Sequence, residues 1–312
     1  MIRYLSIEEF GQWYASARIL ESRFIGKDWA EVYSGEVLFL AFGNSQIDEV
    51  WLVGSLRKFG LRLAITPSGL PSVGFATAKE SADRATRIAE GLQFLRGRGF
   101  HWIHLDFPPE WCTSAPECEG FNRFSKRTYR LQTLGLIEPV ESGFSSSARN
   151  MIQKARRVGL SVSLSSDNTA SMALIRSFLS SLNLNHLIHR YTRMQEILPT
   201  ESLVLINVTK GERVLWTGLF LKEGKGMYYL AGARNRDYPE NSANAFGIHF
   251  AISHAHHEGL AFFDFEGSVI PAVEKFFQSF NPVRMDYFAY EYQNPLLRWL
   301  RTWKHMLSFR KS

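Results

Sequence analysis

The chain of 312 residues contains only two cysteines, Cys112 and Cys118, and both lie in one short segment. Two cysteines do not make the disulfide framework of a small secreted domain, although a single bond between them stays open. The sequence has no run of 18 apolar residues, which argues against a transmembrane helix. Its first residues also lack the long apolar core of a secretory signal. We therefore expect a cytoplasmic protein.

Several motifs of well-known enzyme classes are also missing. The sequence has no Walker or Rossmann glycine pattern and no G-x-S-x-G serine motif. It has no internal repeat of solenoid length and no low-complexity segment. Its basic residues never form a run of five or more, which argues against a disordered nucleic-acid-binding arm. The net charge of +6 instead fits an anionic partner, such as a phosphorylated cofactor, a nucleic acid or an anionic membrane.

The length and the apolar content predict two folded domains. With 45% hydrophobic residues the chain can bury a sizeable core. A chain of 312 residues is long for one core and suggests two domains of about 150 residues each. The serine- and glycine-rich segment 142–147 is the predicted boundary.

Apolar periodicity and turn residues predict a mixture of helices and strands. In the first half we expect a helix over 78–96 and strands over 100–105 and 128–134. Beyond the boundary, helices are predicted over 147–158, 169–182, 244–257 and from 271, and strands over 160–164, 202–208, 214–221, 226–231 and around 264. Meandering strands with helices before and after them indicate a mixed sheet, in an α/β or α+β fold.

Two carboxylates mark the end of one predicted strand. Asp264 and Glu266 lie two residues apart, so alternation places them on one face, with Phe263 and Phe265 on the other. Burying such carboxylates costs several kcal/mol unless partners satisfy them. Strand ends are also where α/β sheets bind ligands. The alternative is a solvated strand edge, with Glu266 capping the helix that Pro271 opens.

The predicted helix 147–158 is strongly basic. Arg149, Gln153 and Arg156 follow each other at helical spacing on one face, while Ala148 and Ile152 belong to the opposite, apolar arc. A stripe of guanidinium groups can bind phosphate bidentately. An ordinary solvated helix face is the alternative.

Two further features have competing explanations. His254, His256 and His257 are close in sequence, but they cannot all face one metal ion from a single helix, so we expect no metal site. The C-terminal segment 291–312 is predicted to form a basic amphipathic helix with a stripe of leucines and tryptophans. It could lie on an anionic membrane, or pack back on the N-terminal domain, which is the interpretation that we favour.

Three of these blocks together resemble the Fem/GNAT-type acyltransferases, a family of peptidoglycan aminoacyltransferases and related N-acyltransferases. The segment 147–159 is similar to their R-x-x-I-x-K-A-x-x-x-G block, and 227–233 to their Y-x-x-G-A strand. The segment 264–267 and the helix containing Phe276 are similar to their D-F-x-G strand and following helix. The resemblance covers residues 143–290 and implies two tandem GNAT-like domains. Residues 1–142 would then be a degenerate N-terminal copy, because they match the family only in general layout.

The resemblance implies that an amine attacks an activated acyl carbon without a covalent enzyme intermediate. A base must then take a proton, and donors must stabilise the tetrahedral oxyanion. Asp264 and Glu266 become candidates for amine binding or proton transfer, and Tyr229 (or Tyr228) for contact with the substrate or the leaving group. The backbone near Ala231 and Gly232 could hold the acyl carbonyl.

Two departures from the family bear on the acyl donor. Aminoacyl-transferring members carry Phe-Lys before a final Phe-Gly, where this chain has Phe276-Phe277 and Phe280-Asn281. The acyl-CoA loop [RQ]-x-x-G-x-[GA] is also absent. Arg234 and Arg236, which precede the helix containing Asn244, could still bind phosphate at that helix N-terminus, in addition to Arg149 and Arg156.

We therefore expect an N-acyltransferase with no tightly bound cofactor, acyl-CoA as co-substrate and a small-molecule or cell-wall-precursor amine as acceptor. It would act in the cytoplasm or in peripheral contact with an anionic membrane. The alternatives are an aminoacyl-tRNA-dependent enzyme of peptidoglycan-precursor synthesis, a non-catalytic binding protein on a decayed fold, and a nucleic-acid-binding protein that uses the basic helix.

Overall fold

The computed structural model describes residues 1–79, 83–165, 168–267, 270–295 and 297. The chain divides into two compact units. Unit 1 consists of Met1–Lys126 and Asp286–Ser312, and unit 2 of Arg127–Met285. We describe each unit by itself.

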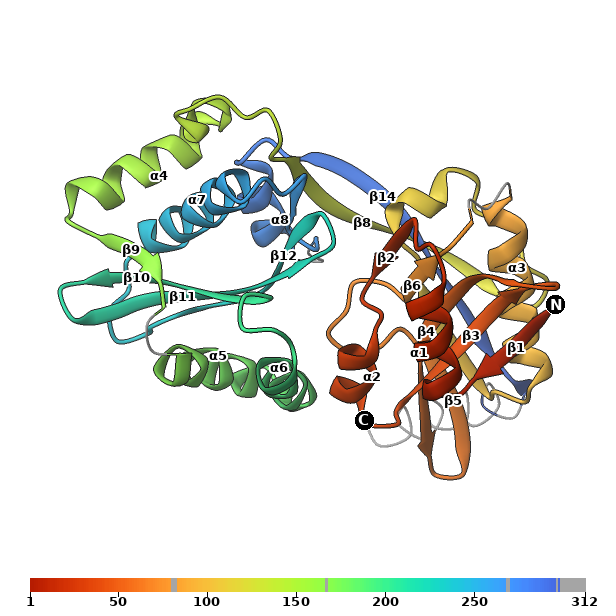
Figure 1. Ribbon diagram of the computed structural model, residues 1–312. Helices are drawn as coiled ribbons and strands as arrows, with labels where there is room; N and C mark the ends of the chain where they lie inside the picture. Colours follow the sequence, from red (N-terminus) through yellow and green to blue (C-terminus); the bar gives the residue numbers. More distant parts are fainter. Residues whose placement is uncertain (80–82, 166–167, 268–269, 296, 298–312) are drawn as a thin grey trace, which may run out of the picture. The chain divides into compact units, whose positions relative to one another are not determined.

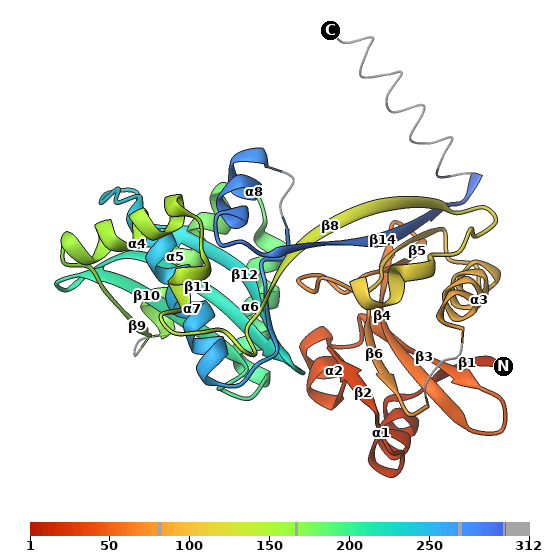
Figure 2. The same cartoon turned by 90° about the horizontal axis from the view of Figure 1, so that it is seen from above.

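Unit 1 is a mixed sheet with helices on both faces. Its strands lie in the order β1-β3-β4-β5-β7-β14, and β6 pairs with both β2 and β4. The stacked pair Phe10–Phe39 joins α1 to one face of the sheet, while Leu40 and Phe42 belong to the core cluster beneath α3. Helix α3 therefore covers one face, and α1 with α2 the other (Figure 2). The elements are β1 (Ile2–Leu5), α1 (Ile7–Ser16), β2 (Glu21–Arg23), α2 (Lys27–Tyr33), β3 (Val37–Gly43), β4 (Ile47–Lys58), β5 (Leu61–Ile65), β6 (Gly74–Thr77), α3 (Arg84–Gly97), β7 (Trp102–Asp106), a 3-10 helix (Pro109–Ser114) and the last part of β14 (Val283–Gln293).

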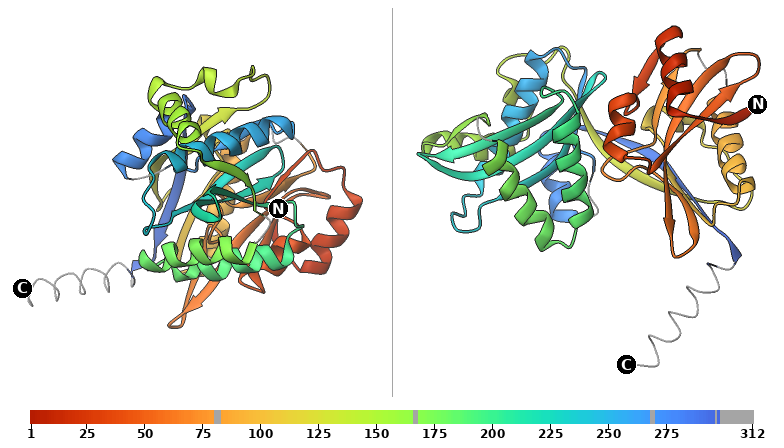
Figure 3. Two further views of the ribbon diagram at one scale, coloured as in Figure 1. Left: turned by 90° about the vertical axis from the view of Figure 1, so that its left-hand side faces the viewer. Right: turned by 60° about the horizontal axis from the view of Figure 1, so that its bottom comes forward.

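Unit 2 is a second mixed sheet, in the order β8-β13-β12-β11-β10-β9. Helices α4 and α7 cover one face of this sheet, and α5 and α6 cover the other (Figure 1). Figure 3 shows α5 and α6 side by side on their face. The elements are β8 (Asn122–Gln132), a 3-10 helix (Val140–Gly143), α4 (Ser146–Arg157), β9 (Ser161–Leu164), α5 (Asn168–Ser181), α6 (Asn185–Ile197), β10 (Leu203–Lys210), β11 (Arg213–Glu223), β12 (Gly226–Arg234), α7 (Ser242–His257), β13 (Phe262–Asp264), α8 (Pro271–Gln278) and the start of β14.

The same local topology occurs in both units. In unit 1 the antiparallel strands β3, β4 and β5 are followed by β6, α3 and then β7, which pairs with β5 in parallel. In unit 2 the antiparallel strands β10, β11 and β12 are followed by α7 and β13, which pairs with β12 in parallel. The predicted mixed α/β fold with two tandem copies of one topology is therefore confirmed.

The unit borders differ from the predicted ones because of strand pairing. Arg130, Leu131 and Gln132 of β8 pair with β13, so the chain enters unit 2 at Arg127 rather than at residue 143. Residues 289–293 of β14 pair with β7, so the chain returns to unit 1 at Asp286 rather than after residue 290. The predicted helix 291–312 begins on three residues that belong to β14, and residues 296 and 298–312 lie outside the described residues.

The core of unit 2 fixes the position of α7 on the sheet. Trp216 of β11 is 1% exposed and packs beneath this helix. A Cβ atom built on Gly247 of α7 would lie 2.1 Å from the Trp216 ring. Any larger residue at position 247 would push the helix away from the sheet, because close-packed side chains leave no room for an added methyl group. The indole thus determines how closely α7 approaches β11.

Candidate functional site

A large pocket begins where β12 and β13 separate. The two strands pair from Gly226 to Tyr228, and the last partner of β12 on β13 is Asp264. Beyond that point β12 continues for six residues to Arg234, and three of them line a pocket of about 1050 Å³. The lining comes from β12, α4, α5, α7, α8 and adjoining loops: Ser145, Ser147, Ala148, Met151, Phe178, Tyr229, Gly232, Arg234, Arg236, Asn241, Asn244, Ala245, Ile270, Ala272, Val273, Lys275, Phe276, Phe277, Gln278 and Ser279.

Strand β12 is irregular beside this pocket. Phe220 of β11 pairs with Tyr229, but Leu219 pairs with Ala231, so Leu230 is an extra residue on β12. A bulge of this kind twists a strand and redirects its backbone groups and side chains. The Tyr191 hydroxyl of α6 donates to the Leu230 carbonyl oxygen over 3.4 Å. The bulge therefore lies directly after Tyr229 and is contacted by α6.

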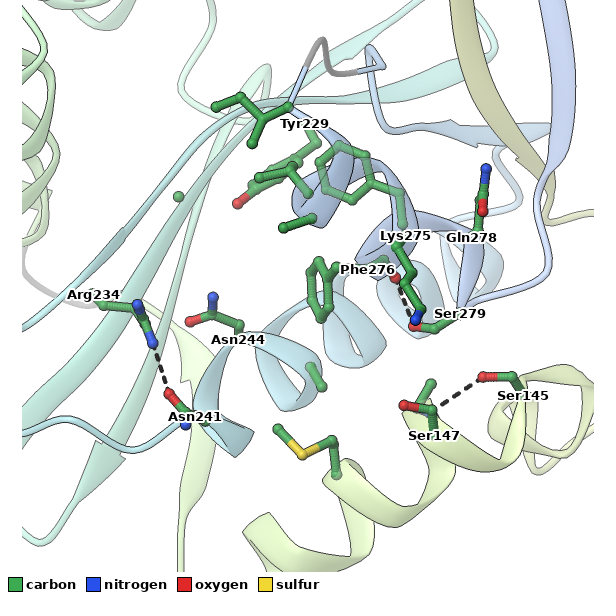
Figure 4. A pocket seen from close by; sticks show the side chains of 18 of the residues that line it. Ser145, Ser147, Tyr229, Arg234, Asn241, Asn244, Lys275, Phe276, Gln278 and Ser279 are labelled. Atoms are coloured by element: carbon green, nitrogen blue, oxygen red, sulfur yellow. Dashed lines mark hydrogen bonds between the residues drawn. The ribbon is translucent and has the colours of Figure 1, made fainter.

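Tyr229 projects from β12 into the pocket (Figure 4). Its ring stacks on Phe220 and meets the edge of Phe277 of α8. Burial raises the pKa of the Tyr229 phenol above its usual range. Near neutral pH the side chain is therefore a protonated phenol, which can donate a hydrogen bond or a proton but cannot serve as a base.

The pocket lining includes two arginines and two asparagines. Arg234 donates to the Asn241 side-chain oxygen over 2.8 Å, and Arg236 to the Ser181 hydroxyl over 3.3 Å. The Oδ1 atom of Asn244 is inaccessible to solvent and has no hydrogen-bond partner among the described residues. None of the lining residues is acidic. This set of residues is suited to an anionic group.

The N-terminus of α7 is less open to a ligand than the sequence suggests. Glu240 accepts the Ser242 N–H over 3.0 Å, and its side chain also pairs with Lys154 of α4 over 3.0 Å. The Ser242 N–H and Lys154 lower the pKa of Glu240 to about 2, so the carboxylate is charged at any physiological pH. An internal anion thus occupies part of the helix end, and the two arginines provide the charge for a bound anion.

A second part of the lining was not predicted. Lys275, Phe276 and Ser279 of α8 and the segment after it line the pocket, together with Ser145 and Ser147 at the start of α4. Every residue from Ala272 to Ser279 except Glu274 lines the pocket, so the lining is not confined to one face of α8. Nothing in the sequence shows that this helix borders a cavity.

The arginine stripe of α4 does not line the pocket. The helix presents Ser147, Ala148 and Met151 to it instead. Arg149 donates to the carbonyl oxygens of Ser142 and Phe144 in the segment that precedes the helix. Arg156 pairs with Glu141 over 2.7 Å. The structure therefore brings Arg234, Arg236, Asn244 and Tyr229 together, but not the arginines of α4.

Asp264 is buried in an ion pair rather than exposed in the pocket. Its Oδ2 atom accepts two hydrogen bonds from the Arg130 guanidinium, at 3.0 and 2.9 Å, and both side chains are 4% exposed. Its Oδ1 atom accepts from the Thr128 hydroxyl and from the Glu266 backbone N–H. Asp264 thus fixes the turn that positions Glu266.

Glu266 is partly buried, and its environment differs from that of a solvated carboxylate. Its backbone has φ 57°, a left-handed conformation that is uncommon for this residue type. Its Oε1 atom is inaccessible to solvent and has no hydrogen-bond partner among the described residues. Burial, and to a smaller extent the charge of Asp264, raise the pKa of Glu266 well above its usual range. Helix α8 has Ile270 as its N-cap and no side-chain cap, so Glu266 does not cap it.

The described residues contain no group of three or more His, Cys, Asp or Glu side chains arranged to hold a metal ion. His256 binds the Thr133 carbonyl oxygen, and His257 pairs with Glu138. Within the same described part of the chain, none of the helices combines the length and apolar character that a membrane span requires.

Comparison with known proteins gives matches at the level of structure alone. No profile of a known family matches the sequence, and no curated protein matches it. Among solved structures, FemX superposes with a TM-score of 0.65 at 12% identity, covering 96% of this chain and 99% of that chain. The C-terminal domain of a candidate lysylphosphatidylglycerol synthetase from Agrobacterium fabrum gives 0.56 at 12% identity, covering 97% and 96%. A tandem GNAT protein from the clavulanic acid pathway gives 0.51 at 7% identity, covering 93% and 97%. The chain therefore has a Fem/GNAT-type fold.

Proposed function

We propose that this protein is an N-acyltransferase of Fem/GNAT type that binds acyl-CoA in the unit 2 pocket and transfers the acyl group to an amine. The observation that carries the proposal is the pocket itself. It starts at the separation of β12 and β13, holds Tyr229 at that point, and has three cationic and no acidic lining side chains. This combination suits a long ligand with a reactive acyl end and an anionic remainder.

The donor is held by its phosphates and its extended arm. Arg234 and Arg236 bind the pyrophosphate, and the amide N–H group of the Asn244 side chain provides a further donor. From residue 229 to residue 234 an extended strand spans roughly 17 Å. An extended pantetheine arm can follow β12 over this distance and bring the thioester to Tyr229.

The reaction joins the amine nitrogen to the acyl carbon and breaks the carbon–sulfur bond. Backbone N–H groups near Ala231 and Gly232, beyond the last residue pair with β13, stabilise the tetrahedral oxyanion. The Tyr229 phenol, which stays protonated at neutral pH, donates its proton to the leaving sulfur. These two groups serve the donor side of the reaction.

We assign to Glu266, which lies outside the pocket lining, the proton that the attacking amine must lose. A carboxylate of ordinary pKa is a weak base at neutral pH, and the raised pKa of Glu266 brings it closer to the working pH. Asp264 is a positioning residue, because its oxygen accepts the Glu266 N–H and holds the turn. On this proposal the acceptor is an amine, of the small-molecule or cell-wall-precursor class.

A second candidate donor is an aminoacyl-tRNA. The sequence lacks lysine at the position of α8 where aminoacyl-transferring relatives carry it, but Lys275 on the same helix lines the pocket. The terminal phosphates of a tRNA could use this cation. A protein that binds a donor and transfers nothing is the third possibility, and turnover separates it from the other two.

The test measures donor binding and turnover on the full chain. Acetyl-CoA at 100 times its Kd should stabilise the fold by about 2.7 kcal/mol. Arg234→Ala should weaken binding by about 1.5–3 kcal/mol, the range for hydrogen bonds to charged groups. Arg157→Ala is the control, because Arg157 is exposed and lies outside the pocket lining.

Release of free CoA thiol in the presence of a panel of amines reports transfer. Stabilisation by aminoacyl-tRNA but not by acetyl-CoA would mean that the donor is aminoacyl-tRNA and not acyl-CoA. Binding of acetyl-CoA without thiol release across the panel would favour the binding-protein alternative.

A further inference from the structure

The polar groups of the pocket fall into separate sets. Figure 4 shows Tyr229, Arg234 and Lys275 at three different places around the pocket, with Phe276 between the last two in this view. Ala148 and Met151 of α4 add further apolar surface. A single phosphate or pyrophosphate held at Arg234 leaves the set around Lys275 without a role. The pocket therefore has room and polar groups for a second, separate anionic group.

Lys275 is available for such a group. It is exposed and forms no ion pair within the described residues. Its neighbour Glu274 is engaged elsewhere, because it pairs with Arg127 over 3.1 Å and accepts from the Tyr129 hydroxyl. The carboxylate adjacent in sequence thus does not neutralise the ammonium group.

Three hydroxyl-bearing residues accompany Lys275 at this end of the pocket. Ser279 lies one helical turn after Lys275, and Figure 4 shows Ser145 and Ser147 of α4 on the same side of the pocket. Helix α4 begins here, with Ser145 as its N-cap. The Ser145 hydroxyl accepts the Ala148 N–H, and the Ser145 N–H donates to the Ser279 carbonyl oxygen, so the N–H groups of Ser146 and Ser147 are the ones without a partner within the helix. The Ser279 hydroxyl donates to the Phe276 carbonyl oxygen. The Lys275 ammonium group, the Ser145 and Ser147 hydroxyls and these two N–H groups remain as donors, and no carboxylate lines the pocket beside them, which fits a phosphate.

We infer that Lys275, with Ser145 and Ser147, forms a second phosphate subsite that recognises a phosphate remote from the pyrophosphate. This rests on the proposed acyl-CoA donor, for which the remote group is the 3′-phosphate of the ribose. The subsite makes the protein specific for CoA over dephospho-CoA, which differs from it only by that group. Arg234 contributes equally to the binding of both compounds.

The experiment compares CoA and dephospho-CoA binding by calorimetry at constant, moderate ionic strength, because salt screens an exposed ammonium group. The unmodified chain should bind CoA at least about tenfold more tightly, a factor that corresponds to 1.4 kcal/mol. Lys275→Ala should bind CoA as weakly as dephospho-CoA and leave dephospho-CoA binding unchanged. Lys275→Arg should keep the preference, since it keeps the charge.

Two controls separate a subsite from general electrostatic attraction. Arg234→Ala should lower the affinity for CoA and for dephospho-CoA by the same factor. Lys210→Ala, an exposed lysine at the end of β10 and outside the pocket, should change neither. Two results would overturn the subsite: equal affinity of the unmodified chain for CoA and dephospho-CoA, or an equal loss of affinity for both in Lys275→Ala. Neither result would contradict the proposal that the pocket binds the donor. Binding of neither compound would overturn the acyl-CoA donor, and the subsite with it.

Discussion

The hydroxyl of Tyr229 occupies the space that a side chain at Gly232 would need. A Cβ atom built on Gly232 would lie 1.9 Å from the Tyr229 Oη atom and 2.9 Å from its Cζ atom. Both residues are on β12 and both line the pocket. The absence of a side chain at position 232 therefore allows the phenol to take its position beside the bulge at Leu230.

This relationship predicts the effect of Gly232→Ala. The added methyl group forces the Tyr229 ring to move, which should cost about 1–3 kcal/mol of stability and lower donor affinity. In a Tyr229→Phe background the nearest obstacle becomes Cζ rather than Oη, so Gly232→Ala should cost less there. Chemical denaturation of the unmodified chain, the two single variants and the double variant measures the stability cost of Gly232→Ala in each background. Equal costs in both backgrounds would mean that the hydroxyl is not the obstacle.

Tyr229→Phe by itself tests the role of the phenol. The change removes one oxygen and keeps the ring packed on Phe220 and Phe277, so the melting temperature should change little. Turnover should fall by roughly 10²-fold or more, the typical contribution of a general acid or base. Acyl-CoA affinity should stay within about threefold. Tyr238→Phe is the control, because Tyr238 is 40% exposed and outside the pocket lining.

Glu266→Gln is predicted to change both activity and the pH dependence of stability. The pKa of Glu266 is raised in the fold, so between its unfolded and folded values the native state binds more protons than the unfolded state. Stability contributed by this group is therefore complete below the unfolded value of about 4.3 and is lost as the pH rises from there toward the folded pKa, at about 1.4 kcal/mol per pH unit.

Glutamine cannot ionise, so Glu266→Gln should become more stable than the unmodified chain as the pH rises above about 4.3, while acyl transfer is lost. Thermal unfolding between pH 4 and 8 measures the stability difference, and thiol release measures activity. Glu212→Gln, at an exposed position, should give no pH-dependent gain. Unchanged turnover in Glu266→Gln would remove this residue from the mechanism.

Asp264→Asn should mainly reduce stability. It breaks the buried ion pair with Arg130, and removing one member of such a pair typically costs about 3–5 kcal/mol. Replacing both members, as in Asp264→Asn with Arg130→Met, should cost less than the single change, since the ion pair is then removed as a whole. Asp237→Asn, on an exposed loop, is the matched control. A drop in turnover at full stability would instead assign Asp264 to the chemistry.

Much of unit 2 was predictable because its signals are local. Serine before the basic helix and Gly159 after it predicted α4, which begins after the Ser145 N-cap and ends at Arg157, before Gly159 at φ 72°. Tyr229 and Asp264 were expected on separate strands, and they lie on the adjacent strands β12 and β13. Helix α6 was missed, because its N-cap is Leu184, which provides no side-chain cap.

The arginines cannot be assigned to a site from local sequence alone. The candidates for an anion site were Arg149, Arg156, Arg234 and Arg236, and residue type does not show which of them border a pocket. Tertiary contacts separate them, because Glu141 pairs with Arg156 and backbone carbonyl oxygens accept from Arg149. Arg234 and Arg236 border the pocket. Lys275 was passed over because only the tertiary structure shows that α8 borders the cavity.

The sequence by itself determined most strands and helices of unit 2, their apolar faces and the order of the Fem/GNAT-like blocks. These depend on side-chain spacing, capping and turn residues, which act over a few neighbouring positions. The tertiary structure alone decided that Asp264 is a buried ion-pair partner and that Glu266, two residues later, is a carboxyl group with a raised pKa. That difference arises from desolvation and from Arg130, and both depend on groups that only folding brings together.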